Sequence, residues 1–214
     1  MSFESERKAL VEAMKQSGAV KSFEVENAFL SVKREFFVRP DLQHLAYADD
    51  ALPLTQGQTI SQPSTIAVML ESLQAKQGQN VLEVGSGCGY ALALLSKIVG
   101  DKGKVFGVEL LPELAELSKK NLQNAGVKNV EVFCADGSKG LPEKAPFDRI
   151  LISAACNFVP KALIEQLADG GRIVAPVGDK FTQQLEILQK VKEKILKTYA
   201  QGLYVFVPLK LGKT

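Results

Sequence analysis

The stretch "NVLEVGSGCGY", residues 80–90, decides how this 214-residue chain folds. A short apolar run ends at three closely spaced glycines, Gly85, Gly87 and Gly89, and the residues that follow are apolar on nearly all sides. Glycine permits a tight turn and lets a ligand come close to the backbone. The stretch therefore predicts a buried strand, a glycine loop that can hold a ligand, and a buried helix. A turn that serves packing alone is the alternative.

Strands and helices alternate outward from this stretch. Strand-like runs occur at residues 104–109, 129–134, 147–153 and 170–178, and helix-like runs at 90–99, 111–126 and 160–167. The alternation predicts an α/β fold, a doubly wound and mostly parallel sheet with helices on both faces. After Gly178 the helices stop, and we expect antiparallel strands that close the sheet at residues 184–191, 194–200 and 203–209.

The chain before the alternating region has a different pattern. Helical periodicity is found at residues 4–17 and 24–34, and a long irregular connector, residues 36–54, follows. Long connectors inside compact domains are often functional. We expect one domain, residues 1–214, in which 1–75 form a helical and substrate-loop segment, 76–178 the cofactor-binding core and 179–214 the C-terminal strands.

The composition is that of an ordinary globular protein, with 46% hydrophobic and 23% charged residues. The net charge is +2, from 26 basic and 24 acidic residues spread evenly, which argues against binding to nucleic acid or to an anionic membrane. The three cysteines and the single histidine, His44, are too scattered for a disulfide framework or a metal site. Because long apolar runs and a signal-peptide core are missing, we expect a cytoplasmic protein. We also expect a monomer.

Acidic residues stand at the ends of successive predicted strands. Glu109 ends the second strand, where a carboxylate can accept hydrogen bonds from both hydroxyls of a ribose, and Asp136-Gly137 ends the third, where it can meet an adenine amino group. We expect Glu83, just before the loop, to add a third acid to this rim. The loop spacing differs from that of dinucleotide sites, and the loop carries no basic residue. This combination favours a site for a cationic ligand without phosphate, S-adenosylmethionine. The alternative is that the acids are ordinary surface residues exposed to solvent.

Seven segments, in order, carry a resemblance over almost the whole chain: "REFFVRP", "ALPLTQGQTISQP", "VLEVGSGCGY", "ADG", "APFDRILISAA", "ALIEQLADGGRIVAPVG" and "YVFVPL". The chain resembles the protein-L-isoaspartate O-methyltransferase family, and "GQTISQP" is the most specific part. The resemblance implies a Rossmann-like class I methyltransferase with an altered order of its last strands. It also implies a repair enzyme that transfers a methyl group from S-adenosylmethionine to the α-carboxylate of L-isoaspartyl residues in proteins and peptides. S-adenosylhomocysteine is the by-product, and the methyl ester then closes to a succinimide.

Residue roles also follow from the resemblance. Ser61 matches the active-site serine. The residues that match the cofactor site are Gln58, Thr59, Ile60, Glu83, Gly85, Ser86, Gly87, Gly89, Glu109, Leu110, Asp136 and Gly137. Those that match the substrate side are Ala154, Ala155, Val205 and Val207. The chain departs from the family pattern at Cys156-Asn157-Phe158, where small residues or proline are usual, so we expect the substrate side of the pocket to differ.

The segment "TQGQTISQPS", residues 55–64, has a physical rationale in this chemistry. A carboxylate is ionised at neutral pH, since its pKa is about 4, so it needs orientation rather than a base before it attacks a methyl group. Uncharged side chains and the free N–H groups of a helix N-terminus can orient it without quenching its charge. The alternative for Ser61 is an ordinary helix N-cap.

Three other functions remain open at this point. A related methyltransferase acting on RNA or a small metabolite would have a basic face or an extra recognition domain. A non-catalytic adaptor that recognises altered aspartyl residues would lose the glycine loop or Ser61. A dinucleotide oxidoreductase would need the other loop spacing and a catalytic His or Tyr constellation. The sequence has none of these features.

Overall fold

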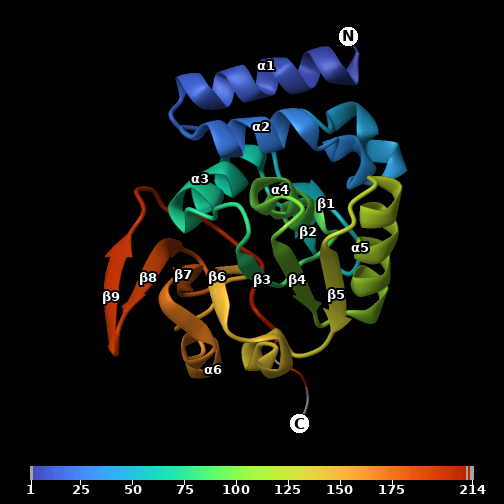
Figure 1. The fold of residues 1–214 in the computed structure, drawn as a ribbon. Coiled ribbons are helices and arrows are strands. Elements are labelled where there is room, and N and C mark those ends of the chain that lie inside the picture. The colour runs from blue at the N-terminus through green and yellow to red at the C-terminus, as the bar shows by residue number, and fades with distance from the viewer. Residues whose placement is uncertain (1, 211, 213–214) are drawn as a thin grey trace.

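The central sheet has the strand order β5-β4-β3-β6-β7-β8-β9 in the computed structural model, which describes residues 2–210 and 212 (Figure 1). The parallel strands are β3 (Asn80–Val84), β4 (Lys104–Glu109), β5 (Val130–Cys134), β6 (Phe147–Ile152) and β7 (Leu167–Gly178). The antiparallel strands β8 (Gln183–Val191) and β9 (Lys194–Tyr199) complete the sheet. The predicted mostly parallel sheet with C-terminal antiparallel strands is confirmed.

The chain changes direction across the sheet between β5 and β6. From β3 it moves outward through β4 to β5, and it then returns to place β6 on the other side of β3. The loops that follow β3 and β6 therefore leave neighbouring strands in opposite directions. In open α/β sheets such a switch point is where ligands bind, at the carboxyl ends of the strands.

Helices cover one face of the sheet in two layers. Next to the strands lie α3 (Pro63–Leu73), α4 (Tyr90–Val99) and α5 (Pro112–Asn124), and their apolar residues share one core with those on this face of the strands. Above them α2 (Phe23–Ser31) packs on α3 and α4, and α1 (Phe3–Gln16) packs on α2 (Figure 1). Burial of Leu10, Val11 and Met14 toward α2 explains the helical periodicity of the N-terminal segment.

The opposite face is covered more thinly, by the short helix α6 (Lys161–Glu165) and the 3-10 turns η3 (Gly137–Lys139) and η4 (Pro142–Lys144). Adjacent strand residues serve the two faces, since Val81 joins the core under the long helices and Leu82 joins the core on this side. Strands buried on both faces account for the continuous apolar runs in the sequence. Helices on both faces, as predicted, are confirmed.

Two elements differ from the sequence expectation. The second helix ends at Ser31 rather than at residue 34, and Arg34 starts a 3-10 turn, η1 (Arg34–Phe36), followed by another, η2 (Pro40–Leu45). The strand expected at 203–209 is wrong. This segment makes only isolated bridges, Tyr204 with Gln183 and Pro208 with Ala155, because it crosses from the start of β8 to the loop after β6 and meets each neighbour for a single residue.

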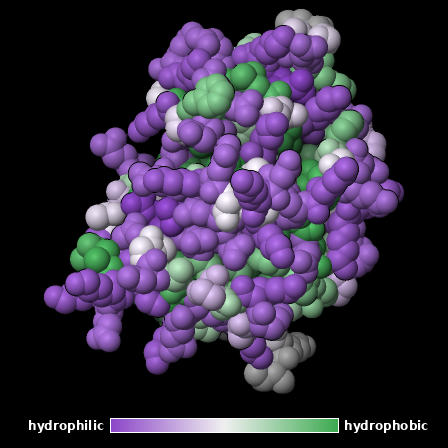
Figure 2. Space-filling view, viewed as in Figure 1, coloured by the Kyte–Doolittle hydropathy of each residue, from purple (hydrophilic) through white to green (hydrophobic). Residues whose placement is uncertain are grey.

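The surface is mainly hydrophilic on the face seen in Figure 2, with hydrophobic residues scattered among charged ones. Within residues 2–210 and 212, no helix is both long and apolar enough to cross a membrane. β9 forms one of the two edges of the sheet, where each of its residues is exposed, Lys194 and Lys197 among them. Charged side chains on an edge strand hinder pairing with the edge of another sheet.

Candidate active site

The glycine loop connects β3 to α4 at the switch point. Gly85, Gly87 and Gly89 have φ values of 79°, 52° and 88°, in the left-handed region that favours glycine. A Cβ on Gly87 would meet only the Cδ1 of Leu54, at 3.9 Å, so the backbone is open to a ligand there. A Cβ on Gly89 would lie 2.5 Å from the Ser118 hydroxyl oxygen of α5, so this glycine permits helix packing. The loop therefore serves both a ligand and the core.

Glu109, the last residue of β4, ties the glycine loop to the neighbouring strand. Its Oε2 accepts a hydrogen bond from the Gly87 N–H at 2.9 Å, and its Oε1 accepts one from the Leu111 N–H at 3.0 Å. The side chain is only 7% exposed. Each carboxylate oxygen has a second lone pair, so the two ribose hydroxyls can still be accepted. The loop and this carboxylate fit the ribose end of S-adenosylmethionine.

Asp136 and Gly137 follow β5 at the same edge of the sheet. The Asp136 carboxylate accepts hydrogen bonds from the N–H of Ser138 at 3.0 Å and from its hydroxyl at 2.7 Å. Burial raises the pKa of Asp136, but the two hydrogen bonds from Ser138, a hydrogen bond from the Gly212 N–H and the charge of Lys139 together outweigh burial, so that the pKa lies below its usual value and the group stays ionised. A Cβ on Gly137 would lie 2.6 Å from the Cγ1 of Val84, so close packing on β3 requires glycine here.

Glu83 does not lie on the rim, and the expectation that it adds a charge there is wrong. Glu83 is 1% exposed, because β3 is an interior strand between β4 and β6 and Glu83 lies beneath the glycine loop, near Cys88. Its Oε1 accepts a hydrogen bond from the Ser153 hydroxyl at 2.6 Å, and its Oε2 is buried without a partner among the described residues. Burial raises the pKa of Glu83 to about 8, the Ser153 hydrogen bond lowers it, and Glu109 raises it. The group is therefore largely neutral at pH 7.

Ser61 lies between a small β-ribbon and α3. The ribbon pairs β1 (Leu52–Pro53) with β2 (Thr59–Ile60), and Ser61 follows directly. The N-cap of α3 is Gln62, so the alternative that Ser61 is the helix cap is wrong. Asp49 takes the capping role, because its carboxylate accepts hydrogen bonds from the Ser64 N–H at 2.8 Å and from the Gln62 amide at 3.1 Å. The N–H of Ser64 is thus not free for a substrate anion, contrary to expectation.

Arg34 holds the connector in place from inside the protein. Its side chain is fully buried and donates to four main-chain carbonyls, those of Ala46 (2.7 Å), Ala48 (3.4 Å), Asp50 (3.1 Å) and Ser61 (3.2 Å). Sequence reasoning assigned no role to Arg34, although it stands in the "REFFVRP" segment. An irregular connector has main-chain carbonyls that regular secondary structure does not pair, and an arginine just before it can donate to them. This position in the sequence could have indicated the role of Arg34.

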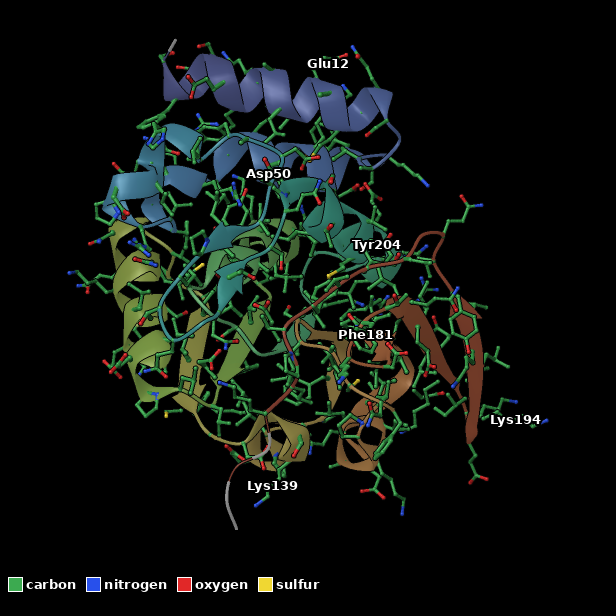
Figure 3. All side chains as sticks on the ribbon, turned by 180° about the vertical axis from the view of Figure 1, so that it is seen from behind. Glu12, Asp50, Lys139, Phe181, Lys194 and Tyr204 are labelled. Atoms are coloured by element: carbon green, nitrogen blue, oxygen red, sulfur yellow. The ribbon has the colours of Figure 1, made fainter. Side chains whose placement is uncertain are left out.

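A cavity of about 260 Å³ brings the predicted substrate elements together. Thr59 and Ser61 line it from the connector side, Ser153 lines it from the end of β6, and residues 203–207 close it. Figure 3 shows this side of the molecule, with Asp50 on the connector and Tyr204 on the C-terminal segment. Ser153 was not predicted as a site residue.

The loop after β6 anchors the C-terminal segment over the cavity. Ala155 donates its N–H to the carbonyl of Val207 at 2.8 Å, and its carbonyl accepts from Leu209 at 2.7 Å. Ala154 is buried and lies under the glycine loop, where its Cβ would be 3.5 Å from a Cβ on Gly85. The departure at 156–158 places Phe158 at the surface with 72% of it exposed.

The comparison with protein families identifies the chain. The family described as protein-L-isoaspartate(D-aspartate) O-methyltransferase (PCMT) matches residues 5–214. The chain belongs to this family. The protein-L-isoaspartate O-methyltransferase of Pyrococcus abyssi is 46% identical over 204 residues, which cover 94% of this chain and 93% of the relative. That of Staphylothermus marinus is 45% identical over 213 residues, covering 97% and 95%.

Solved structures of the family have the same fold. A protein-L-isoaspartate O-methyltransferase superposes with a TM-score of 0.85 at 32% identity, covering 94% of this chain and 65% of that longer chain. A putative family member from Plasmodium falciparum, solved in complex with S-adenosyl-L-homocysteine, superposes with a TM-score of 0.83 at 26% identity, covering 95% and 98%. The family assignment decides against the oxidoreductase, the adaptor and the RNA or metabolite methyltransferase.

The protein is therefore a repair methyltransferase that uses S-adenosylmethionine and acts on isoaspartyl residues of damaged proteins. S-adenosylmethionine supplies a methyl group made electrophilic by positively charged sulfur. The residues around the cavity have to bind and orient a carboxylate and to exclude water. Within residues 2–210 and 212, no three His, Cys, Asp or Glu side chains gather closely enough to hold a metal ion.

Proposed function

We propose that Ser61 orients the α-carboxylate of the isoaspartyl residue for methylation. The observation that carries this proposal is that Ser61 lines the cavity between the connector and the C-terminal segment while Asp49, not Ser61, caps α3. A serine hydroxyl that is not used by the helix is available to donate to one carboxylate oxygen. The other oxygen then remains free to attack the methyl group.

The cavity suits an ionised carboxylate because its polar groups are uncharged. The side chains with polar atoms that line it are those of Thr59, Ser61, Gln62, Thr65, Ser153 and Tyr204. The nearby positive charge, on Arg34, is directed at main-chain carbonyls. A direct ion pair would bind the carboxylate more tightly but would reduce its nucleophilicity, so orientation by hydroxyls favours transfer.

We infer that the methyl donor lies along the glycine loop. Glu109 accepts from the ribose hydroxyls, and Asp136 accepts from the adenine amino group. The open backbone at Gly87 and the acidic edge of the sheet support this arrangement. The full set of proposed cofactor-binding residues is Gln58, Thr59, Ile60, Gly85, Ser86, Gly87, Gly89, Glu109, Leu110, Asp136 and Gly137. Glu83, with 1% of it exposed, does not belong to this set.

We infer that the substrate peptide runs along the C-terminal segment, with Ala154, Ala155, Val205 and Val207 on the substrate side. Tyr204 exchanges both of its main-chain hydrogen bonds with Gln183. Successive residues of an extended chain direct their N–H and C=O groups to opposite sides, so Val205 directs its own away from Gln183. Val205 lines the cavity and is 77% exposed. Its main chain can therefore pair with an extended peptide.

We also propose that the enzyme is a cytoplasmic monomer of one domain that binds neither nucleic acid nor membrane. An even charge balance, with a net charge of +2, supports the lack of a polyanionic partner. The lysines on the free edge of β9 support the monomer. The one-domain proposal is supported by a single core cluster that contains Leu10, Leu92 and Leu185, one from each of the three predicted segments.

The test is Ser61→Ala, measured with an isoaspartyl peptide and its aspartyl twin. We expect kcat to fall by roughly tenfold to a hundredfold, the effect of one hydrogen bond to a charged group. The affinity for S-adenosylhomocysteine and the melting temperature should hardly change, and the residual activity should keep the wild-type pH profile between about pH 6 and 8, since a carboxylate needs no base.

Ser64→Ala is the matched control, because the main-chain bond from Ser64 to Asp49 survives the substitution. It should turn over like the wild type. A Ser61→Ala enzyme with full kcat and a lowered melting temperature would contradict the proposal, since the serine would then matter only for folding.

A further inference from the structure

Ser153 connects the substrate cavity with a buried carboxyl group that the reaction does not otherwise use. The residue follows β6 directly, and its N–H donates to the carbonyl of Val84 at 2.8 Å. Its hydroxyl lies 2.6 Å from Oε1 of Glu83. Ser153 also lines the cavity that contains Ser61. A hydroxyl in this position can make one hydrogen bond inward and another toward the substrate.

The surroundings of Glu83 hold it neutral rather than charged. Its strand lies between β4 and β6, with Gly107 and Leu151 as register partners. The titratable groups that face it are Glu109, from the end of β4, and Cys88, from the glycine loop. Among the described residues Glu83 has no basic partner, and its Oε2 is buried and unpaired. An ionised carboxylate in this position would be buried beside a like charge without compensation.

The protonation state of Glu83 decides what Ser153 can offer to the cavity. A serine hydroxyl has one hydrogen and two lone pairs, and a protonated carboxyl group can donate one hydrogen bond. In the structure Ser153 donates to Oε1 across the 2.6 Å contact, the direction that an ionised Glu83 requires. If Glu83 is neutral with the proton on Oε1, its O–H donates to the Ser153 oxygen instead, and the Ser153 hydrogen is free to point into the cavity. If Glu83 is ionised, it can only accept, so Ser153 must donate inward and present lone pairs to the cavity. Lone pairs repel a carboxylate.

We propose that Ser153 is a second hydroxyl donor to the isoaspartyl carboxylate, and that neutral Glu83 orients it by donating to its oxygen. This inference rests on the proposed role of Ser61, since both hydroxyls line one cavity. Ser153 contacts the substrate, and Glu83 acts only through Ser153 as a positioning residue. Two hydroxyls from different elements hold one carboxylate more rigidly than one hydroxyl does.

The proposal predicts a specific pH dependence. Burial raises the pKa of Glu83 to about 8, so Glu83 is neutral below that pH and ionises above it. The nearby thiol of Cys88 does not change this titration of Glu83. Burial raises the pKa of Cys88 to about 12, so the thiol stays neutral over the same pH range. Affinity for the isoaspartyl peptide should therefore be full below about pH 8 and should be lost as the pH rises through this value.

The experiment measures initial rates over about pH 6 to 9.5 with an acetylated isoaspartyl peptide that lacks His, Cys, Lys and Tyr, so that the peptide itself does not titrate. Formation of S-adenosylhomocysteine is followed, because the methyl ester is unstable in base. The enzymes are the wild type, Ser153→Ala, Ser153→Thr, Glu83→Gln and, as a matched hydroxyl control, Ser31→Ala at the exposed end of α2.

We expect Ser153→Ala to raise the KM for the peptide by roughly tenfold to a hundredfold and to remove the fall above pH 8, with S-adenosylhomocysteine affinity unchanged. Ser153→Thr should restore the wild-type KM and its pH dependence. Glu83→Gln should keep the low KM at every pH, since the amide always donates to Ser153. Ser31→Ala should behave like the wild type.

Glu83→Gln also separates the titration of Glu83 from that of the methyl donor, because the α-amino group of S-adenosylmethionine has a pKa of about 8 too. A fall in activity above pH 8 that persists in Glu83→Gln would overturn the proposal, as would an unchanged KM in Ser153→Ala. If Ser61→Ala is impaired but Ser153→Ala is not, only this inference fails. If Ser61→Ala is unimpaired, the proposed function of Ser61 fails.

Discussion

Glu109 performs two tasks with one carboxylate, and this makes its removal informative. Its oxygens accept hydrogen bonds from the N–H groups of Gly87 and Leu111 and, as proposed, from the ribose hydroxyls. We expect Glu109→Ala to weaken S-adenosylhomocysteine binding by about 1.5–3 kcal/mol, the value of hydrogen bonds to a charged group. Isothermal titration calorimetry measures this, with the exposed acid Glu116, replaced by Ala, as the control. Unchanged affinity in Glu109→Ala would exclude Glu109 as the ribose ligand.

The buried carboxyl of Glu83 should also affect folding stability. Its pKa is raised from an ordinary value of 4.5 to about 8, so the folded protein binds more protons than the unfolded chain between these values. Stability must therefore fall as the pH rises through this window, by about 1.4 kcal/mol for each pKa unit at most. In Glu83→Gln this contribution to the pH dependence of stability is absent, because glutamine does not titrate.

Chemical denaturation of the wild type and Glu83→Gln between about pH 5 and 8.5 tests the sign. The free energy of unfolding of Glu83→Gln, relative to the wild type, should increase steadily with pH. The test uses the change in unfolding free energy with pH within each protein, so an effect of the substitution that does not depend on pH cancels. A difference that stays constant with pH would mean that Glu83 is ionised in the folded state.

At the scale of elements, the start of α3 depends on a residue from the connector. Asp49 accepts from the Ser64 N–H and from the Gln62 amide, and its negative charge faces the positive end of the helix dipole. We expect Asp49→Ala to destabilise the protein by about 1 kcal/mol. Thermal unfolding measures this loss.

Asp49→Asn is the matched variant, because asparagine caps helices about as well as aspartate. It should retain most of the stability. Because Ser61 directly precedes Gln62, Asp49→Ala should also lower kcat while Asp49→Asn keeps most of it. If both variants lose the same stability, the charge of Asp49 rather than its hydrogen bonds stabilises the helix.

At the scale of the whole molecule, ligand binding should discriminate between cofactor classes. At the carboxyl edge of the sheet lie the open glycine loop after β3, Glu109 at the end of β4 and Asp136 after β5, and the loop itself has no basic residue for a pyrophosphate. S-adenosylhomocysteine at about a hundred times its Kd adds ~2.7 kcal/mol of stability. For a chain of this size the melting temperature should rise by roughly 5–10 °C.

NAD at the same concentration should leave the melting temperature unchanged. Both ligands carry adenine and ribose, so the difference isolates the pyrophosphate and the loop spacing. Scanning calorimetry with each ligand provides the measurement. A rise with NAD but not with S-adenosylhomocysteine would contradict the assignment of the loop to a methyl donor.

Much of the fold could be predicted because it depends on local patterns. The apolar runs of β3 to β7, the glycines between β3 and α4, and the acids at strand ends all lie within short windows of sequence. Strand alternation and helical periodicity indicate which neighbouring residues are buried. Three closely spaced glycines predict a turn, and all three have positive φ in the structure. The order of seven characteristic segments was enough to indicate the family.

The tertiary structure alone decided the state and the partners of individual side chains. The bond between Ser153 and Glu83 joins residues 70 positions apart, and Arg34 reaches Ser61 across 27 positions. Whether Glu83 is a charged rim residue or a neutral buried one depends on which strands flank β3. The segment 203–209 looked like a strand, yet it crosses two different neighbours. Burial and hydrogen-bond partners are set by residues that are distant in sequence, and no local pattern contains them.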